Sequence, residues 1–351
     1  MAARLPRVLT TRELNRAVLA RQGLLDRFDA SLPRVLERVG GIQAQYVPSM
    51  YVGLWSRMAG LERAGVTRAL ERRAVVQATL MRSTIHLVSA RDFWPFADAV
   101  RGPRREWWQR VTRARPTDAE MAAAAEALRG ALADGPLRRA EVEELLGKSA
   151  ARAVGMWFDL VRAPPSGTWE RRRADLYAPA DDWVDPPLGG DVERAAVGAD
   201  HLVRRYLTAF GPASRADIAR WAGVPAATTA PAVERLRLRR FASEDGDDLV
   251  DVPRAPLPPA DAEAPVRFLP TWDATLLVHV RRARILPEEY RPRIFHTRNP
   301  QSVPTFLVDG AVAGTWRHDA GRVDLEPFHR LDRASTRALR EEAERLAAFH
   351  A

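Results

Sequence analysis

The sequence predicts an α+β protein built from tandem winged helix-turn-helix units, followed by a small, barrel-like β-rich domain with a β-hairpin. Three observations support this fold class. Helical periodicity alternates with short polar, hairpin-like segments through roughly the first 250 of the 351 residues. The same order, three helices and then a hairpin, recurs along that stretch. From Val266 onward, apolar and polar residues alternate as they do in strands.

The clearest unit lies between residues 199 and 252. An apolar stripe that ends at Phe210 predicts its first helix, Ser214 caps the second, and Gly223 ends it. A third helix and an acidic hairpin with an Asp-Gly turn follow. The five carboxylates of that hairpin would repel phosphates, so we expect this unit to be scaffold and not a surface that contacts nucleic acid.

Two looser copies of the unit precede it. The first runs from Thr11 to about Val88, and the second spans about residues 135 to 180. In the second copy Gly147 ends a helix that begins at Arg139, and three arginines between Gly167 and Tyr177 form a basic candidate wing. The predicted helices of the first copy lie near residues 11–21, 31–39 and 48–58, and an extended segment from Arg82 to Val88 closes it.

A proline-rich connection between residues 253 and 265 precedes the change to strand-like composition. Asp309-Gly310, between two alternating segments, is a strong signal for a type I′ hairpin, and a closing helix is expected at about residues 334–349. The predicted domains, three winged-helix units and then the β-rich domain, are 1–115, 116–190, 191–255 and 256–351.

The chain contains no cysteine, which excludes disulfides, thiolate catalysis and cysteine-based metal sites. We therefore expect chemistry without a metal or another cofactor. No apolar stretch reaches the roughly 20 residues of a membrane span, and the first residues lack the features of a signal peptide. We expect a cytoplasmic protein with no membrane contact.

The formal net charge of +9 favours a polyanionic partner, and nucleic acid is the commonest one. Lys148 is the single lysine, so almost all of the positive charge comes from arginine. Arginine suits bidentate contacts to phosphate and guanine. A GC-rich genome produces the same arginine-rich, lysine-poor composition, so the arginine count by itself fits both explanations.

Gln43 and Gln45 are the leading candidates for a reaction centre. They lie between Gly40-Gly41 and Pro48, which favours an extended or loop backbone. In an extended backbone the side chains of residues i and i+2 point the same way, so both amides would face one cavity. The alternative is that two loop glutamines simply satisfy nearby backbone groups.

Three segments occur in an order that resembles one family. They are Gly41-Ile-Gln-Ala-Gln-Tyr46, Met81-Arg-Ser-Thr-Ile-His-Leu-Val88 and Phe268-Leu-Pro-Thr-Trp-Asp273. With the later hairpin that ends in Gly314-Thr-Trp-Arg-His318, the chain resembles the AlkZ-like branch of the winged-helix DNA glycosylases over nearly its whole length. The resemblance implies excision of bulky N7-alkylguanine adducts, or of interstrand crosslinks left by DNA-alkylating natural products. It places the family's catalytic Gln-x-Gln motif on Gln43 and Gln45.

A pair of neutral amides restricts the chemistry. A carboxamide donates and accepts hydrogen bonds but takes up no proton near neutral pH, so neither glutamine is a general base. The amides can position a water and stabilise a developing oxocarbenium, which suffices when the leaving base is already cationic, as an N7-alkylpurine is. We expect selectivity for positively charged lesions. With Lys148 in a helix-turn-helix connection, we expect no lyase activity through a Schiff base.

Further residues are candidates for contacts to DNA. Residues 82, 84 and 86 would share one side of an extended strand, and a purely structural histidine is the alternative for His86. Trp316 fits either a wedge in the minor groove or a core position on a strand. The arginine runs near 104 and 281 fit either phosphate contacts or a solvated face. The predicted DNA-contacting set is Arg82, Thr84, His86, Arg104, Arg105, Arg281, Arg282, Trp316, Arg317 and His318, and no metal ligands are expected.

These observations favour a monofunctional DNA glycosylase that acts as a monomer on duplex DNA containing alkylated purines. We expect it in the cytoplasm and on the nucleoid, in general repair or in antibiotic self-resistance. A non-enzymatic winged-helix DNA-binding protein or transcriptional regulator is the alternative, and a scaffold that binds damaged DNA without cutting it is a third. A regulator needs a basic recognition helix and usually a dimer interface, whereas the clearest unit here has an acidic wing.

Overall fold

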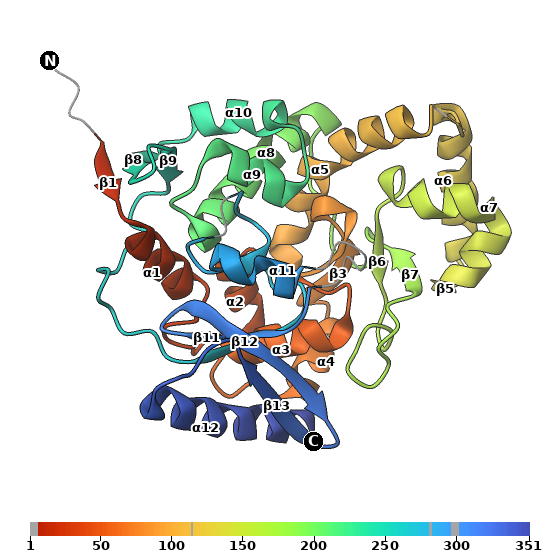
Figure 1. The fold of residues 1–351 in the computed structure, drawn as a ribbon. Helices are drawn as coiled ribbons and strands as arrows, with labels where there is room; N and C mark the ends of the chain where they lie inside the picture. Colours follow the sequence, from red (N-terminus) through yellow and green to blue (C-terminus); the bar gives the residue numbers. More distant parts are fainter. Residues whose placement is uncertain (1–5, 114, 281–282, 296–301) are drawn as a thin grey trace, which may run out of the picture.

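The computed structural model describes residues 6–113, 115–280, 283–295 and 302–351 (Figure 1). Its helices and strands agree with the predicted α+β class. The largest sheet has the strand order β2-β4-β3-β6-β7-β5, and every neighbouring pair is antiparallel. Its strands are β2 (Ile42–Gln43), β3 (Val75–Thr79), β4 (Ile85–Ser89), β5 (Leu137–Arg138), β6 (Leu160–Arg162) and β7 (Leu176–Pro179).

This sheet draws its strands from both of the first two predicted units. Strands β2 to β4 belong to the first predicted unit and β5 to β7 to the second, and they join where β3 pairs with β6 through Gln77 and Arg162. The two units therefore share one sheet. The boundaries given for the four domains stay a prediction.

Four helices accompany the first strands. The three helices predicted for the first copy are present, with ends within one residue of the expected ones. Thr10 caps α1 through a capping box with Glu13, and Gly40, with a φ of 76°, ends α2. The four helices are α1 (Thr11–Arg21), α2 (Leu32–Val39), α3 (Val47–Arg57) and α4 (Arg63–Glu71).

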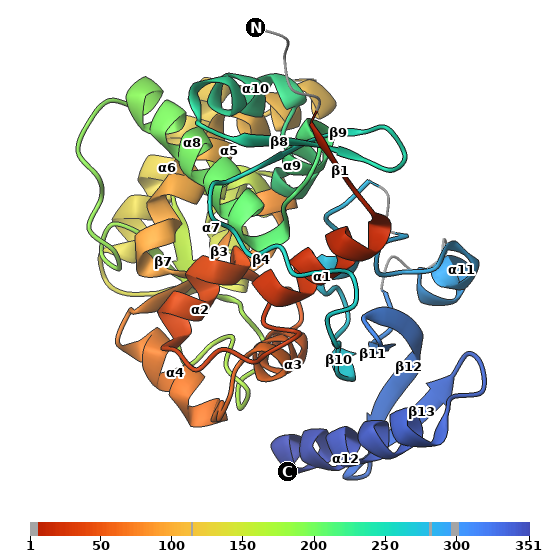
Figure 2. The same ribbon diagram turned by 90° about the vertical axis from the view of Figure 1, so that its left-hand side faces the viewer.

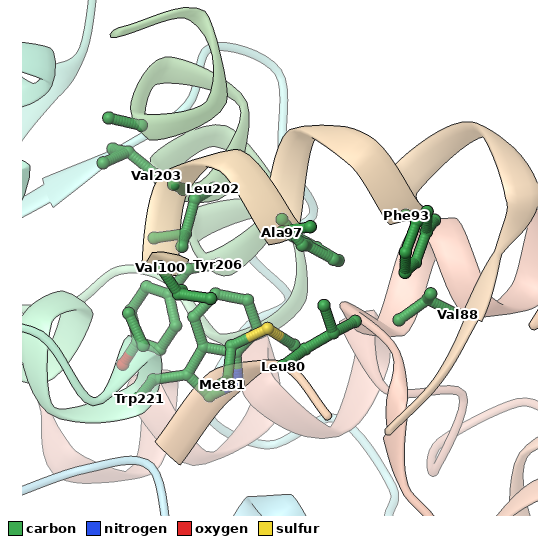
Figure 3. Packing of buried hydrophobic residues seen from close by; sticks show 14 of the residues in the cluster. Leu80, Met81, Val88, Phe93, Ala97, Val100, Leu202, Val203, Tyr206 and Trp221 are labelled. Atoms are coloured by element: carbon green, nitrogen blue, oxygen red, sulfur yellow. The ribbon is translucent and has the colours of Figure 1, made fainter. Parts of the chain in front are cut away.

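Two long helices, α5 (Ala90–Val111) and α8 (Asp191–Phe210), pack against each other and contribute to the largest hydrophobic cluster. Figure 3 shows side chains from both helices around Trp221. The helices approach closely because Gly198 has no side chain: a Cβ there would lie 2.6 Å from the carbonyl oxygen of Pro95.

The order of helix, helix, helix and hairpin predicted for residues 199–252 is present. Ser214 caps the second helix through a capping box, and Gly223, with a φ of 72°, ends it as predicted. The N-terminal strand adds in parallel to the hairpin, which gives a three-stranded sheet. After α8 the elements are α9 (Arg215–Ala222), α10 (Ala226–Arg235), β8 (Arg239–Ser243) and β9 (Asp248–Asp251), and the added strand is β1 (Arg7–Leu9).

A second lobe, at the right of Figure 1, contains α6 (Asp118–Leu132) and α7 (Arg139–Ala153). Gly147 was predicted to end the helix that begins at Arg139, and the helix does break there, at a non-helical φ of 74° and ψ of 156°, so that α7 consists of two helical segments joined by a kink. The candidate wing between residues 167 and 177 is a compact loop, because the Gly167 amide donates to the carbonyl oxygen of Arg173 at 2.9 Å. The loop leaves the side chains of its three consecutive arginines exposed.

The C-terminal part is an open four-stranded antiparallel sheet and not a barrel. Its order is β10-β11-β12-β13, so β10 and β13 are edges within the described ranges. Asp309 and Gly310 form the predicted two-residue turn, with φ of 48° and 80° as a type I′ turn requires. Figure 2 shows β12, β13 and the closing helix at one end of the molecule. The elements are β10 (Arg267–Leu269), α11 (Arg291–Ile294), β11 (Thr305–Val308), β12 (Ala311–Asp319), β13 (Arg322–Pro327) and α12 (Arg333–His350).

Among the described helices, none is both long enough and apolar enough to cross a membrane.

Candidate active site

The segment with the two candidate glutamines lies at one edge of the six-stranded sheet. Gly40 and Gly41 have φ of 76° and 78°, a left-handed backbone that turns the chain from α2 into β2. Strand β2 pairs with β4 and places Gln43 opposite His86. The chain then bends at Gln45, before α3 begins.

A half-buried arginine, Arg82, holds the side chain of Gln43. Nη2 of Arg82 donates to Oε1 of Gln43 at 3.1 Å and to Nε2 of His86 at 3.3 Å, and Nη1 donates to the carbonyl oxygen of Trp221. Arg82 lies in a short 3₁₀ turn (Met81–Ser83) with a left-handed φ of 52°. Burial lowers the pKa of Arg82 to about 10, so the guanidinium stays charged at neutral pH. The amide of Gln43 is therefore held in one orientation by a cation.

His86 is a neutral residue inside this cluster. Its Nδ1 donates to the carbonyl oxygen of Thr84 at 3.0 Å, which leaves Nε2 to accept from Arg82. Burial, with the charge of Arg82 as the second cause, lowers the pKa of His86 to about 3. His86 therefore cannot act as a cationic general acid near neutral pH.

Arg82 and His86, which were predicted to contact a backbone phosphate, are turned inward, and that contact stays a prediction. The ring nitrogens of His86 and the terminal nitrogens of Arg82 bond inside the protein, and Arg82 lies in a turn and not on the strand. The hydroxyl of Thr84 donates to the carbonyl oxygen of Met81 at 3.2 Å. These residues form the support behind Gln43.

Gln45 faces a different hollow from Gln43. Its Oε1 accepts from the backbone amide of Ile85 at 3.1 Å, and it lines a pocket of about 490 Å³ between α5, α7, β3 and β6. Gln43 instead lines a narrow cleft beside Thr271 and Trp272. The expectation that both amides face one cavity is wrong, because the chain leaves the extended conformation at Gln45.

We call the hollow beside Gln45 the arginine-lined pocket. Arg104 is 9% exposed in its wall, where Nη1 donates to the carbonyl oxygen of Thr79 at 2.9 Å and Nε to Oγ of Ser83 at 3.2 Å. The sequence analysis missed Arg162 and Ser83, which also line it. Ser83 lay inside a segment that carried the family resemblance, whereas Arg162 carries no local signal beyond its charge.

A larger hollow of about 870 Å³ lies between α3, α12 and the β12–β13 hairpin, and we call it the hairpin groove. Tyr46, which is 50% exposed, borders it directly after Gln45. Arg172 borders both the hairpin groove and the arginine-lined pocket. The two hollows therefore adjoin each other at the glutamine segment. The sequence analysis did not find Tyr46 as a lining residue, although it stands in the Gln-x-Gln segment.

The hairpin residues differ in what they can contact. Trp316 is 7% exposed and its Nε1 donates to the carbonyl oxygen of Leu269 at 3.0 Å, so it is a core residue and the prediction of a wedge is wrong. Arg317 pairs with Asp324 at 3.3 Å across the exposed hairpin. His318 stacks on His350 with ring centroids 4.1 Å apart. Arg317 and His318 line the hairpin groove and stay predicted DNA contacts.

The remaining predicted arginines lie elsewhere. Nη2 of Arg105 donates to the carbonyl oxygen of Met156 at 2.9 Å, and its guanidinium lies 4.8 Å from the ring centroid of Trp157, so it joins α5 to the second lobe. Arg281 and Arg282 lie outside the described residues. Within the part of the chain that the structure describes, no three or more His, Asp or Glu side chains form a group that could hold a metal ion.

Comparison with solved structures gives the class of the fold. The chain superposes on the DNA glycosylase AlkZ of Streptomyces sahachiroi with a TM-score of 0.80, at 19% identity over 98% of this chain and 97% of that one. It therefore has the fold of a DNA glycosylase. A curated protein of Streptomyces sahachiroi, named interstrand DNA cross-link repair glycosylase, is 24% identical over 365 residues, which is 94% of this chain and 93% of that protein.

The family model described as DNA glycosylase AlkZ-like matches residues 36–349. This match spans most of the chain, so the chain belongs to the AlkZ-like DNA glycosylase family. The family resemblance predicted from the order of the three motifs is confirmed.

Proposed function

We propose that this protein is a monofunctional DNA glycosylase that hydrolyses the N-glycosidic bond of alkylated purines in duplex DNA, above all N7-alkylguanine. The observation that carries the proposal is the placement of two neutral amides at one sheet edge. Gln45 lines the arginine-lined pocket, and Gln43 lines the narrow cleft that shares Pro270 and Thr271 with the hairpin groove. Membership of a DNA glycosylase family supports base excision as the reaction.

In the proposed reaction the bond between C1′ and N9 breaks, and its electron pair moves into the cationic purine, which leaves as a neutral base. A water oxygen bonds to C1′ and releases its proton to solvent. Oε1 of Gln45 accepts one protein hydrogen bond and keeps a second lone pair that can accept from this water. Oε1 of Gln43, in the adjoining cleft, likewise keeps a lone pair, which can stabilise the positive charge that develops on the sugar. A base that leaves neutral needs no protonated side chain, which suits a site whose histidine stays uncharged.

The proposed lesions include interstrand crosslinks and bulky natural-product adducts. The name of the similar Streptomyces sahachiroi protein, an interstrand DNA cross-link repair glycosylase, supports this range. The hairpin groove, at about 870 Å³, offers a bulky group more room than a methyl lesion needs. Such a protein serves either general repair or self-resistance in a producer of a genotoxic compound.

We also propose that α8 to β9 form a winged helix and that the protein works as a monomer on chromosomal DNA. Three helices in sequence, followed by an antiparallel hairpin, support the first point. Sedimentation of the protein with a duplex that carries one lesion tests whether the protein works as a monomer. One chain per duplex is expected, and a dimer on a single lesion contradicts it.

The experiment that tests the proposed function measures base release from a duplex with a single N7-alkylguanine. We expect Gln43→Ala/Gln45→Ala to release the base about a hundredfold more slowly than the wild type, or worse, because the water is no longer positioned. DNA binding should change little. Gln109→Ala is the matched control, since Gln109 bonds Asp118 on the second lobe and lines neither hollow.

Two results contradict the proposal. If the wild type releases no base from either a methyl lesion or a bulky adduct, the protein binds DNA without catalysis. If the double variant releases the base at the wild-type rate, the reaction centre lies elsewhere on the chain.

A further inference from the structure

The arginine-lined pocket holds more positive charge than its own carboxylates balance. Its wall combines α5, α7, β3, β6 and the loop before β7, and Gln45 and Ser83 lie on the side of the candidate active site. Asp159 and Asp175 are the carboxylates that line it. The arginines that line it are Arg104, Arg139, Arg152, Arg162, Arg172 and Arg173.

Two of these arginines are nine-tenths buried and lack a carboxylate partner. Arg104 is 9% exposed and Arg162 is 7% exposed, and neither forms an ion pair with a described residue. Both converge on Thr79: Nη1 of Arg104 donates to its carbonyl oxygen at 2.9 Å, and Nη2 of Arg162 donates to its Oγ1 at 3.0 Å. Burying an unpaired guanidinium costs free energy, which a bound anion would offset.

Both guanidinium groups keep unused donors. The other bonds run from Nε of Arg104 to Oγ of Ser83 at 3.2 Å and from Nε of Arg162 to the carbonyl oxygen of Ala174 at 3.0 Å. Nη2 of Arg104 and Nη1 of Arg162 therefore have no hydrogen-bond acceptor among the described residues. Burial lowers the pKa of Arg104 to about 10, which still leaves it charged at neutral pH.

The carboxylates of the pocket are committed to other arginines. Oδ2 of Asp159 accepts from Nη2 of Arg101 at 2.6 Å. Oδ1 of Asp175 lies 3.9 Å from Nη1 of Arg138. Neither arginine lines the pocket. The charge of Asp159 also acts on Arg104, and the guanidinium of Arg162 lies 4.2 Å from the ring centroid of Tyr177, but both guanidinium groups keep donors for an anion from outside the chain.

We propose that the arginine-lined pocket binds the DNA backbone phosphate next to the damaged nucleotide, with Arg104 and Arg162 as its ligands. This inference rests on the proposed glycosylase function. The two unesterified oxygens of a phosphodiester match the hydrogen-bond donors of two guanidinium groups. Each deoxyribose lies between two phosphates, so a phosphate anchored beside Gln45 holds the sugar at the amide. A pocket of about 490 Å³ has room for the phosphate and an attached sugar.

The test scans the phosphates around the lesion. The probe is a duplex with a tetrahydrofuran abasic analogue, which has no base to release, and with a single uncharged methylphosphonate at each flanking position in turn. In the wild type, one flanking position should weaken binding by about tenfold or more, because it removes a charge-assisted contact.

In Arg104→Gln, the methylphosphonate at that position should weaken DNA binding by less than about twofold, because the side chain that contacts this phosphate is already gone. Arg110→Gln is the matched control: Arg110 is an exposed arginine on the same helix and should keep the wild-type pattern. Arg173→Gln removes an exposed arginine of the pocket wall and serves if Arg104→Gln does not fold. Arg173→Gln should reduce the loss of DNA binding that the methylphosphonate causes at that position. An unchanged loss counts against the proposal.

The proposal is overturned if a methylphosphonate weakens binding equally at all flanking positions in the wild type. It is also overturned if Arg104→Gln loses as much binding as the wild type at the sensitive position. Free phosphate is the other source of such an anion. If inorganic phosphate raises the unfolding temperature of the wild type at constant ionic strength, while no single methylphosphonate position weakens DNA binding more than the others, the pocket is a free-phosphate site. Binding to the abasic analogue needs no catalysis, so a protein that releases no base can still pass or fail this test.

Discussion

Nη2 of Arg82 lies 3.1 Å from Oε1 of Gln43, and Nη1 of the same side chain donates to the carbonyl oxygen of Trp221. Trp221 belongs to α9, so one half-buried arginine links the third predicted unit to the amide at the sheet edge. Gly223 allows this approach, since a Cβ there would lie 2.7 Å from Cα of Arg82. We therefore predict that the helical unit with the acidic hairpin positions Gln43 through Arg82.

Arg82→Lys tests this positioning role. Lysine keeps the charge but lacks the planar fork that reaches Gln43 and Trp221 together, so we expect single-turnover base release to slow by about tenfold to a hundredfold. The Kd for an abasic-analogue duplex should stay near the wild-type value, because Arg82 is turned inward. A raised Kd with an unchanged rate would instead make Arg82 a DNA-binding residue.

Lesion charge should decide the substrate. A duplex with N7-methylguanine should lose its base, whereas a duplex with uracil should not, because uracil leaves as an anion and the site offers no acid. His86, with a pKa of about 3, is neutral at the assay pH. Parallel time courses with the two duplexes are the measurement, and rapid release of uracil would refute the two-amide mechanism.

The product should be an intact abasic strand. Lys148, the single lysine, is exposed on α7 and lines neither the arginine-lined pocket nor the hairpin groove. Borohydride added during turnover should trap no protein–DNA adduct, because no side-chain amine reaches C1′. Lys148→Ala should release the base at the wild-type rate. A trapped adduct that disappears in Lys148→Ala would instead show that Lys148 forms a Schiff base with the DNA.

Acid should destabilise the protein through its buried histidines. Burial lowers the pKa of His86 from 6.5 to about 3, so between these values the unfolded chain binds a proton that the folded chain does not. The free energy of unfolding should therefore be fully present above pH 6.5 and fall as the pH decreases toward 3. Between pH 6.5 and pH 5, one such histidine should lower the free energy of unfolding by about 2 kcal/mol.

Urea unfolding of the wild type and of His86→Gln at pH 6.5 and at pH 5 measures the contribution of His86 to this pH dependence. The variant should lose less stability on acidification than the wild type. Equal losses in the two proteins would mean that His86 does not supply the pH dependence. His279, whose pKa burial also lowers to about 3, should act in the same direction.

A buried ion pair should hold the C-terminal sheet to the glutamine region. Arg57 on α3 donates two hydrogen bonds to Asp273, at 2.8 and 2.9 Å, and the side chains are 2% and 4% exposed. Asp273→Ala leaves the buried guanidinium of Arg57 without its carboxylate partner, so we expect a loss of about 3 to 5 kcal/mol in unfolding free energy. Asp324→Ala, which removes the exposed partner of Arg317, should cost about 1 kcal/mol or less. Similar losses for both variants would contradict this ranking.

The sequence by itself determined the local elements and the family. The ends of α1 and α2, the cap at Ser214 and the turn at Asp309-Gly310 were predictable, because caps and tight turns depend on residues a few positions apart. The order of the three motifs was enough to indicate the AlkZ-like family, since the motifs are read directly from the chain.

Only the tertiary structure decided which side chains meet and which ones face solvent. The contacts of Arg82 with Trp221 and of Arg162 with Thr79 join residues from distant segments, and no local pattern encodes them. Trp316 points into the core and Gln45 away from the cleft of Gln43, because neighbouring elements cover one face of each segment. The C-terminal sheet stays open for a similar reason: closure needs pairing between its edge strands, and strand pairing is a long-range interaction.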